Sequence, residues 1–529
     1  MKKFDWLISV VAGVVFLFLS SWYISLPGLN YDESLCAAPA VNFVVDDPKS
    51  EPTQINPSVI YLFGRPIPMM LMTYIGPVKT ILYIPIFWIL DVSVFTVRLL
   101  PLIIMFLCFP LAYYLFKEIF NREVAIFTVF LMSVDPSIVF YLTRDVGPAT
   151  LQVFFKLLAL MFFIKWWELK KNIFLYLGFF VLGLGVTHKV DFLWVIVGMI
   201  IPVTIFYFGK LKERLNIKVL MFSGLFFAIG AFPIILFNIY TGGYTFSPMT
   251  DKFLSSKLPS DAYFLSNLIT RANQIIEIHN GNFIAFLFCE KNVYDGFWKY
   301  IHLIFLSISI FSILFYLIIK NKPKNFLNIL AIVVYILIVT IETCFSPTVL
   351  SGHHLLALTP FITVVIVYAI LSMKYLKNAA KYFVLIFLMI YLLYSSIRIN
   401  VIFEETGGAG HWSNSVYELN DYLKKENKTI GALDWGYTNN LIVLSKSQFK
   451  IKRLYTSVWK NVDVNNYIKE NLSDSIIYLA YSEKYTTFPV VKNVFFETAK
   501  EAGYDIILEK EFYQGSGEVV HRVFKLKKD

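Results

Sequence analysis

The chain has 529 residues, of which 57% are hydrophobic and only 16% are charged. No single soluble core of this length can hide so much apolar side chain from water, which excludes an ordinary soluble enzyme and indicates that the lipid bilayer is the solvent. The net charge of +10 comes from Lys and Arg in short segments between apolar runs. That placement is typical of membrane orientation, so we expect no nucleic-acid partner.

The apolar runs predict the transmembrane helices. The first, from about Leu7 to Leu26, is longer than the roughly 7 to 15 apolar residues of a signal peptide and no small-residue cleavage site follows it, so we expect a retained signal anchor. Because one crossing needs ~20 residues, the chain is predicted to have about eleven transmembrane helices. They begin near Leu7, Val92, Val124, Ala149, Ile173, Phe192, Val219, Ile301, Phe326, Leu355 and Phe383.

Basic connectors predict the orientation. They fall on alternate sides of the predicted helices, at residues 117–122, 170–171, 210–218, 320–324 and 374–381. Since Lys and Arg favour the cytoplasmic side, we expect a multi-pass cell-membrane protein with its N-terminus in the cytoplasm. The loops 27–91 and 241–299, the shorter loops near residues 143–148, 187–191 and 346–354, and the tail then lie outside. The long loop 241–299 is predicted to be a lid.

The tail from about His411 differs from the rest of the chain, because charges occur throughout it. Short β-rich runs at Thr429–Leu433, Ser475–Tyr481 and Val519–Leu526 are separated by helical patterns such as Val490–Ala502. This alternation predicts a small extracytoplasmic α/β domain at 401–529, after a transmembrane domain at 1–400.

The four cysteines match no metal-binding spacing. Cys36 and Cys289 both fall in predicted exterior loops, where an oxidising compartment would let them pair. Buried single thiols are the alternative, and the one we favour.

Two adjacent carboxylates, Asp32 and Glu33, follow the first apolar run by a few residues. A base at the membrane surface can take a proton from an acceptor hydroxyl while a lipid-borne sugar lies within reach. The structural alternative is that Asp32 caps an interfacial helix beginning at Glu33.

An acidic pair in this position resembles the signature of the GT-C glycosyltransferases, notably the protein mannosyltransferase and aminoarabinose transferase group. Further stretches resemble that group in order over residues 1 to about 400. GRPIPMMLMTYIGPVKTILYIPIFWIL with VRLLPL is similar to its Pro-rich loop and "R-L-P" helix, and YLTRDVGPATLQVFF to its second exterior loop. LGLGVTHKVDFLW is similar to its "T-K" helix and GHHLLALTPF to its "R-Y-L-L-P-x-x-P" segment.

The resemblance implies a GT-C fold and a polyprenyl-phosphate-linked sugar donor. By position it implies that Asp32 is the base, that Glu33 orients it or binds the acceptor, and that Asp145 serves the acceptor or a metal. A divalent cation held by Asp32 and Asp145 through oxygen ligands is left open, and no cofactor is otherwise implied.

Transfer from a phosphate carrier needs cations where negative charge builds on the leaving group. In the predicted exterior loops the alternative role of such cations is contact with lipid headgroups. His353 occupies the place where the family has Arg, which suggests a shifted donor or help from Arg271. The candidate phosphate-binding residues are Arg65, Arg144, His188, Lys189, His353 and His354.

In the tail, Asp434-Trp435-Gly436-Tyr437 is faintly similar to the W-W-D-Y-G motif of oligosaccharyltransferases, another GT-C branch, but the paired Trp is missing. We interpret Asp434 instead as the end of a strand and the cap of the next helix.

The predicted function is inverting transfer of one sugar from a polyprenyl-phosphate carrier to a lipid, glycan or protein acceptor at the outer face of the membrane. A ligase that moves a whole lipid-linked glycan shares the same one-sided site. A transporter of lipid-linked sugars would place charges near the middle of helices and show related halves, which this sequence does not.

Overall fold

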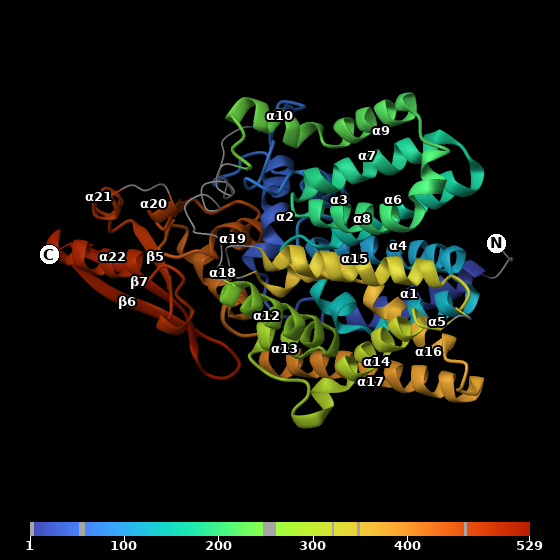
Figure 1. Cartoon of the computed structure of the whole chain (residues 1–529). Coiled ribbons are helices and arrows are strands. Elements are labelled where there is room, and N and C mark those ends of the chain that lie inside the picture. Colours follow the sequence, from blue (N-terminus) through green and yellow to red (C-terminus); the bar gives the residue numbers. More distant parts are fainter. Residues whose placement is uncertain are drawn as a thin grey trace.

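A computed structural model of the chain describes residues 5–51, 59–246, 261–319, 322–345, 350–459 and 463–528. A bundle of long helices forms one part of the molecule, and a small α/β domain built from the tail lies at one end of it (Figure 1). Helix α1 (Asp5–Ser21) begins at the end of the bundle away from this domain (Figure 1).

Every predicted apolar run is helical. Six helices are long and apolar enough to cross a membrane: α4 (Val94–Ile119), α6 (Thr150–Leu169), α8 (Phe192–Lys212), α14 (Ile301–Phe315) with the 3-10 turn η2 before it (Gly296–Tyr300), α15 (Phe326–Cys344) and α17 (Asn378–Thr406). Two bent pairs raise the number to eight: α9 (Ile217–Gly230) with α10 (Phe232–Thr241), at 73°, and η3 (Gly352–Leu358) with α16 (Phe361–Ser372), at 47°.

The other predicted spans are shorter helices: α1 (Asp5–Ser21), α5 (Arg122–Val134) and α7 (Asn172–His188). Helix α5 stops early because Asp135 precedes Pro136, and the residue before a proline disfavours the helical conformation. Asp135 then accepts hydrogen bonds from the backbone N–H and hydroxyl of Ser137, which begins the short turn η1 (Ser137–Tyr141). By length and composition, six to eight segments of the described chain could cross a membrane. The predicted number of eleven is therefore confirmed only in part.

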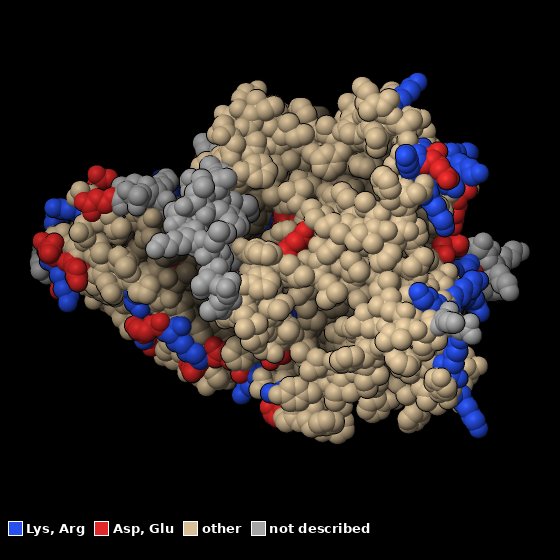
Figure 2. Space-filling model, in the orientation of Figure 1, with Lys and Arg blue, Asp and Glu red and all other residues tan. Residues whose placement is uncertain are grey.

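Charge is distributed along the bundle as a membrane protein requires. Figure 2 shows Lys and Arg gathered at the end of the bundle away from the α/β domain, with a broad, mostly uncharged surface between the two. Lys170, Lys171 and Lys210, from two of the predicted basic connectors, are exposed. Uncharged side chains are what a bilayer requires of a lipid-facing surface, because each buried charge there is costly.

The two long loops that were predicted to be exterior fold into short elements of their own. The first contains α2 (Tyr31–Val44), the antiparallel hairpin of β1 (Val59–Leu62) and β2 (Arg65–Pro68), and α3 (Val78–Leu90). The predicted lid contains α12 (Asp261–Asn280) and α13 (Asn282–Cys289), while residues 247–260 of it lie outside the described part of the chain. Its movement stays a prediction.

The tail forms a five-stranded sheet in the order β4-β3-β5-β7-β6, in which β3 pairs parallel with β4 and β5, and β7 pairs antiparallel with β5 and β6. The three predicted strands and the predicted helix are present as β3, β5, β7 and α22; β4 and β6 were not predicted. Its elements are α18 (Ser415–Glu426), β3 (Thr429–Ala432), α19 (Thr438–Ser445), β4 (Ile451–Arg453), α20 (Thr456–Trp459), α21 (Val464–Lys469), β5 (Ile476–Tyr481), α22 (Pro489–Glu501), β6 (Tyr504–Tyr513) and β7 (Val519–Lys528), with the turns η4 (Gly410–Trp412) and η5 (Glu483–Tyr485).

The α/β domain lies directly on the first of these loops, residues 27–91. The backbone N–H of Gly28 donates to the Trp412 carbonyl at 2.7 Å, and the Asn30 amide donates to the His411 carbonyl at 3.0 Å. The rings of Tyr31 and Trp435 lie 4.4 Å apart. These contacts place the tail above the N-terminal turn of α2.

The favoured prediction for the cysteines agrees with the structure. Cys36 and Cys289 are both buried free thiols and do not form a disulfide with each other.

Candidate active site

A cavity of about 290 Å3 opens between the helical bundle and the α/β domain. Asp32 of α2 lines it from one side and His353 of η3 from another, while His411, Trp435 and Tyr485 of the tail complete the wall. The structure therefore brings together two site residues that lie more than 300 positions apart in the sequence and had been predicted separately.

The backbone of α2 fixes the position of Asp32. Asn30 is the N-cap of this helix, and its side chain accepts a hydrogen bond from the backbone N–H of Asp32 at 2.8 Å. Asp32 is thus not the cap, which excludes the structural alternative for this residue. Among the residues that the structure describes, its carboxylate has no hydrogen-bond or ion-pair partner, so it remains available to a ligand in the cavity.

The surroundings of Asp32 favour its protonated form. Burial raises the pKa of its carboxyl to about 6; Lys189 opposes this shift, and the negative charges of Glu33 and Asp145 add to it. A carboxylate with such a pKa is largely ionised at neutral pH and has a higher proton affinity than an ordinary aspartate, which suits a general base.

The Glu33 side chain does not face the cavity. Both of its carboxylate oxygens accept hydrogen bonds from the Arg98 guanidinium of α4, each at 2.7 Å, and both side chains are buried. Arg98 also donates to the carbonyls of Ile24 and Pro27, at the end of the first helix. Glu33 thereby ties α2 to α1 and α4 and is not among the residues that line the cavity.

Asp145 is also paired. Its carboxylate forms a buried ion pair with Lys79 of α3 and accepts hydrogen bonds from the backbone N–H and hydroxyl of Thr150. Burial alone would raise the pKa of Asp145, but the ammonium of Lys79 holds it below its usual value. Sequence reasoning missed Lys79; a single lysine within the apolar run VKTILYIPIFW is the signal that would have identified it.

Lys189 lies in a second buried group beside the cavity. Its ammonium is 2.9 Å from a carboxylate oxygen of Asp191 and donates to the Gly147 carbonyl at 2.8 Å. His354 bonds the same Asp191 oxygen through Nδ1 at 2.8 Å. Backbone pairing between Ile75 and Lys189 joins this group to the loop 27–91.

His353 packs tightly against the loop 143–148. A Cβ atom on Gly147, whose φ is +64°, would lie 2.3 Å from the His353 ring, so only glycine fits there. The buried Nδ1 of His353 has no hydrogen-bond partner in the described structure. An unsatisfied buried nitrogen beside the cavity is available to a ligand.

The remaining predicted cations are engaged outside the cavity. Arg144 donates to the carbonyls of Ser20, Tyr23 and Leu26 at the end of α1. Arg65 donates to the Phe43 carbonyl and pairs with Asp46, at the C-terminal end of α2. The ring of His188 contacts the Pro148 carbonyl, and Arg271 donates to the Leu350 carbonyl. His354 is bonded to Asp191, as described above.

A cation bridging Asp32 and Asp145 does not fit these contacts, because the Lys79 ammonium already pairs with the Asp145 carboxylate. The described residues contain no group of three or more His, Cys, Asp or Glu side chains arranged to hold a metal.

The interpretation of Asp434 as a helix cap is wrong. Helix α19 has Tyr437 as its N-cap, whereas the Asp434 carboxylate accepts hydrogen bonds from the backbone N–H groups of Trp435, Thr487 and Phe488. Because Asp434 fixes this turn, the neighbouring Trp435 ring lies in the wall of the cavity. The short DWGY run was the only sequence signal for this wall.

Comparison with known proteins tests the resemblance found in the sequence. Residues 77–237 match the family model of dolichyl-phosphate-mannose-protein mannosyltransferase. ArnT from Cupriavidus metallidurans, bound to undecaprenyl phosphate, has a similar structure, with a TM-score of 0.60 at 8% identity over 99% of this chain and 98% of that one. The family-model match and this structural similarity support the GT-C fold that the sequence resemblance implies.

A second GT-C structure is also similar. The archaeal oligosaccharyltransferase AglB from Archaeoglobus fulgidus, in complex with an inhibitory peptide and a dolichol-phosphate, has a TM-score of 0.52 at 12% identity over 100% of this chain and 74% of that one. No curated protein matches the sequence. These similarities show a fold shared with GT-C membrane proteins.

Proposed function

We propose that this GT-C protein transfers a single sugar from a polyprenyl-phosphate carrier to an acceptor at the outer face of the membrane, with inversion of the anomeric configuration. Asp32 acts as the general base. The observation that carries the proposal is that Asp32 alone, of the three predicted carboxylates, is unpaired and faces the cavity, whereas Glu33 and Asp145 are neutralised by Arg98 and Lys79.

The chemistry needs one base and one stabilised leaving group. Asp32 takes the proton from the acceptor oxygen as that oxygen bonds to the anomeric carbon. The bond from the anomeric carbon to the phosphate oxygen breaks on the opposite side, and the electron pair leaves with polyprenyl phosphate. A single displacement of this kind inverts the anomeric centre.

Lys189 is the proposed cation for the leaving phosphate. It is close enough to Asp32 to lower the pKa of that carboxyl, and its negative partner, Asp191, is shared with His354. A phosphate arriving beside His353 would compete with Asp191 for the ammonium of Lys189. Charge-assisted hydrogen bonds of this type strengthen as charge develops on the leaving oxygen.

The donor class is supported by the two similar structures, whose bound lipids are undecaprenyl phosphate in ArnT and dolichol-phosphate in AglB. The size of the cavity favours one sugar over a whole glycan, since its volume of about 290 Å3 is just below the roughly 300–1,000 Å3 common for ligand sites. The alternative, a ligase for a lipid-linked glycan, needs more room.

The acceptor side of the cavity is formed by the tail. His411, Trp435 and Tyr485 offer flat rings, and His411 adds a buried ring nitrogen that has no hydrogen-bond partner in the described structure. Such surfaces bind the apolar faces and polar edges of ligands at one site. This wall accommodates a glycan, lipid headgroup or peptide acceptor, and a transporter would not need it.

Product analysis tests the proposal. Purified protein in lipid nanodiscs is supplied with polyprenyl-monophosphate sugars and, separately, with polyprenyl-diphosphate oligosaccharides, together with an envelope extract as acceptor. We expect transfer from the monophosphate donors, release of polyprenyl phosphate and an inverted linkage by NMR. Transfer only from the diphosphate oligosaccharides would establish the ligase, and a retained configuration would contradict direct displacement.

A further inference from the structure

A second cavity lies on the other side of α13 from Asp32. It encloses about 260 Å3 between the C-terminal half of α12, the start of α13 and the segment leading into α14. Asn282, Phe283 and Phe286 of α13 line this second cavity, whereas Leu287 and the following Glu290 line the Asp32 cavity. The two cavities are therefore neighbours separated by one helix.

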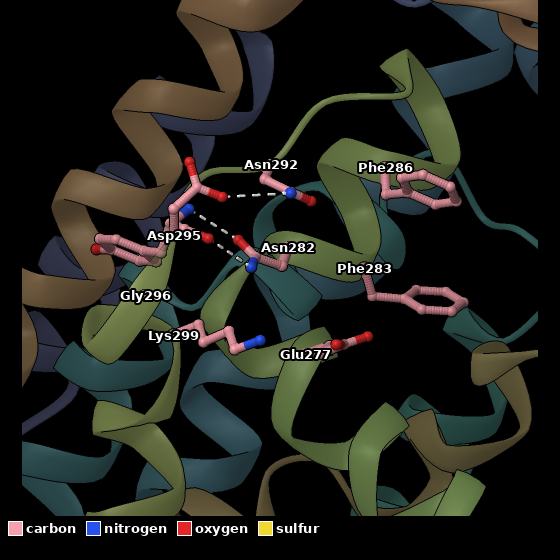
Figure 3. A pocket seen from close by; sticks show the side chains of 9 residues that line it. Glu277, Asn282, Phe283, Phe286, Asn292, Asp295, Gly296 and Lys299 are labelled. Atoms are coloured by element: carbon pink, nitrogen blue, oxygen red, sulfur yellow. Dashed lines mark hydrogen bonds between the residues drawn. The ribbon is translucent and has the colours of Figure 1, made fainter.

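Charged groups of both signs face the second cavity without ion-pair partners. Figure 3 shows Lys299 extending toward the side formed by Glu277, with Asp295 on another wall and the rings of Phe283 and Phe286 opposite it. In the described structure neither Glu277 nor Lys299 forms an ion pair, and the Lys299 ammonium lies 4.8 Å from the centre of the Tyr300 ring. Asp295 accepts only one long hydrogen bond, of 3.4 Å, from Asn292.

The walls of this cavity are held by buried amides. The Asn282 side chain accepts hydrogen bonds from the backbone N–H groups of Val293 and Tyr294 and donates to the Tyr294 carbonyl at 2.9 Å. The Asn280 amide donates to the Lys299 carbonyl at 2.8 Å. Tyr294 in turn stacks on Tyr391 of α17, with ring centres 4.7 Å apart. The segment carrying Asp295 and Lys299 is thus fixed before any ligand arrives.

The second cavity lies where a transmembrane helix begins. The turn η2, which contributes Gly296 and Lys299, continues directly into α14, and together they form one of the six full-length candidate spans. Phe286, Phe297, Trp298 and Tyr300 around it are exposed. Exposed aromatic side chains at the end of a span mark the level of the lipid headgroups.

A ligand that satisfies this cavity must carry both charges. A free anion would meet the carboxylates of Glu277 and Asp295, and a simple cation would meet the ammonium of Lys299. We propose that the cavity binds the headgroup of an outer-leaflet phospholipid that carries a phosphate and a primary amine. The phosphate of the lipid pairs with Lys299, and its ammonium donates to Glu277 and Asp295. The hydrocarbon chains of the lipid then lie against the exposed aromatic side chains.

Lipid selectivity measured on the full-length protein tests this site independently of sugar transfer. Purified, delipidated protein is titrated with dioleoyl phosphatidylethanolamine, phosphatidylcholine and phosphatidylglycerol, and bound lipid is counted by native mass spectrometry. We expect phosphatidylethanolamine to be retained on the order of tenfold better than the other two. Equal retention of all three lipids, or a preference for the anionic phosphatidylglycerol, would overturn the proposal.

Substitutions of the lining residues test whether the lipid preference arises at the second cavity. Glu277→Gln and Lys299→Gln should each reduce the preference for phosphatidylethanolamine to the level of phosphatidylcholine, whereas Lys291→Gln, an exposed lysine of the same loop outside the cavity, should preserve it. Because Glu277 and Lys299 have no ion-pair partners in the described structure, both variants should unfold at the wild-type temperature. A preference that survives in both variants, or binding of a soluble sugar in place of the lipid, contradicts the assignment.

Discussion

The Arg98 guanidinium holds the Glu33 carboxylate through two hydrogen bonds of 2.7 Å in a buried pair, directly beside the unpaired Asp32. Two adjacent acids therefore have different tasks. Glu33 fixes the helix that carries Asp32, and Asp32 faces the cavity.

Replacing Glu33 should harm folding rather than chemistry. Glu33→Gln leaves the Arg98 charge buried without its partner, which typically costs about 3–5 kcal/mol. We expect a large drop in the unfolding temperature in detergent, whereas Asp47→Asn, an exposed acid of the same loop, should have little effect. A Glu33→Gln protein of normal stability that had lost all transfer would instead place Glu33 in the reaction.

Replacing Asp32 should stabilise the protein. Its pKa is raised from 3.8 to about 6 in the folded state, so the folded state loses stability as the pH rises from about 4 to 6, and the loss is complete above that range. Asp32→Asn removes the free-energy cost of keeping an ionised carboxylate buried in the folded state, which is about 1–3 kcal/mol at pH 7. The variant should unfold at a higher temperature than the wild type at pH 7 and at a similar temperature near pH 4. A variant less stable at pH 7 would show that Asp32 has a stabilising partner.

Much of this fold follows from composition and pattern, because apolar runs and strand alternation are local signals. The ion pairs are not local. Nothing in the sequence near Glu33 indicates that its partner is Arg98, which lies 65 positions away. Asp145 and Lys79 form an ion pair across a similar separation. Strand β6 was missed because charged residues such as Glu509 and Lys510 interrupt its apolar pattern. The wall formed by His411 and Trp435 arises only when the tail folds onto α2.

Lys189→Gln should weaken donor binding more than acceptor binding. Loss of a charge-assisted phosphate contact costs roughly 1.5–3 kcal/mol, or about tenfold to a hundredfold in donor affinity. Because the single change also leaves Asp191 without its lysine, the double variant Lys189→Gln/Asp191→Asn is the matched control for folding. Unchanged affinity for a polyprenyl-phosphate sugar in the folded double variant would remove Lys189 from the donor site.

Orientation of the chain remains a prediction, and the structure selects the positions that test it. Ser415 is buried and Asn461 lies outside the described residues, so neither suits labelling. Ser516 is exposed in the tail, Lys171 is exposed at the opposite end, and the four native cysteines are buried. In intact cells an impermeant thiol reagent should label Ser516→Cys and should not label Lys171→Cys. The reverse pattern would place the active-site cavity in the cytoplasm.

The most direct test of the account is the transfer rate of purified Asp32→Asn protein, measured beside wild type and Asp145→Asn with the same donor and acceptor. The substitution keeps the shape of the side chain and removes the proton acceptor, so the rate should fall by the ~10² to 10⁴ that general-base catalysis contributes, in a protein that is folded and more stable than wild type. Transfer at a near wild-type rate by folded Asp32→Asn, with Asp145→Asn inactive, would contradict the assignment of Asp32 as the base.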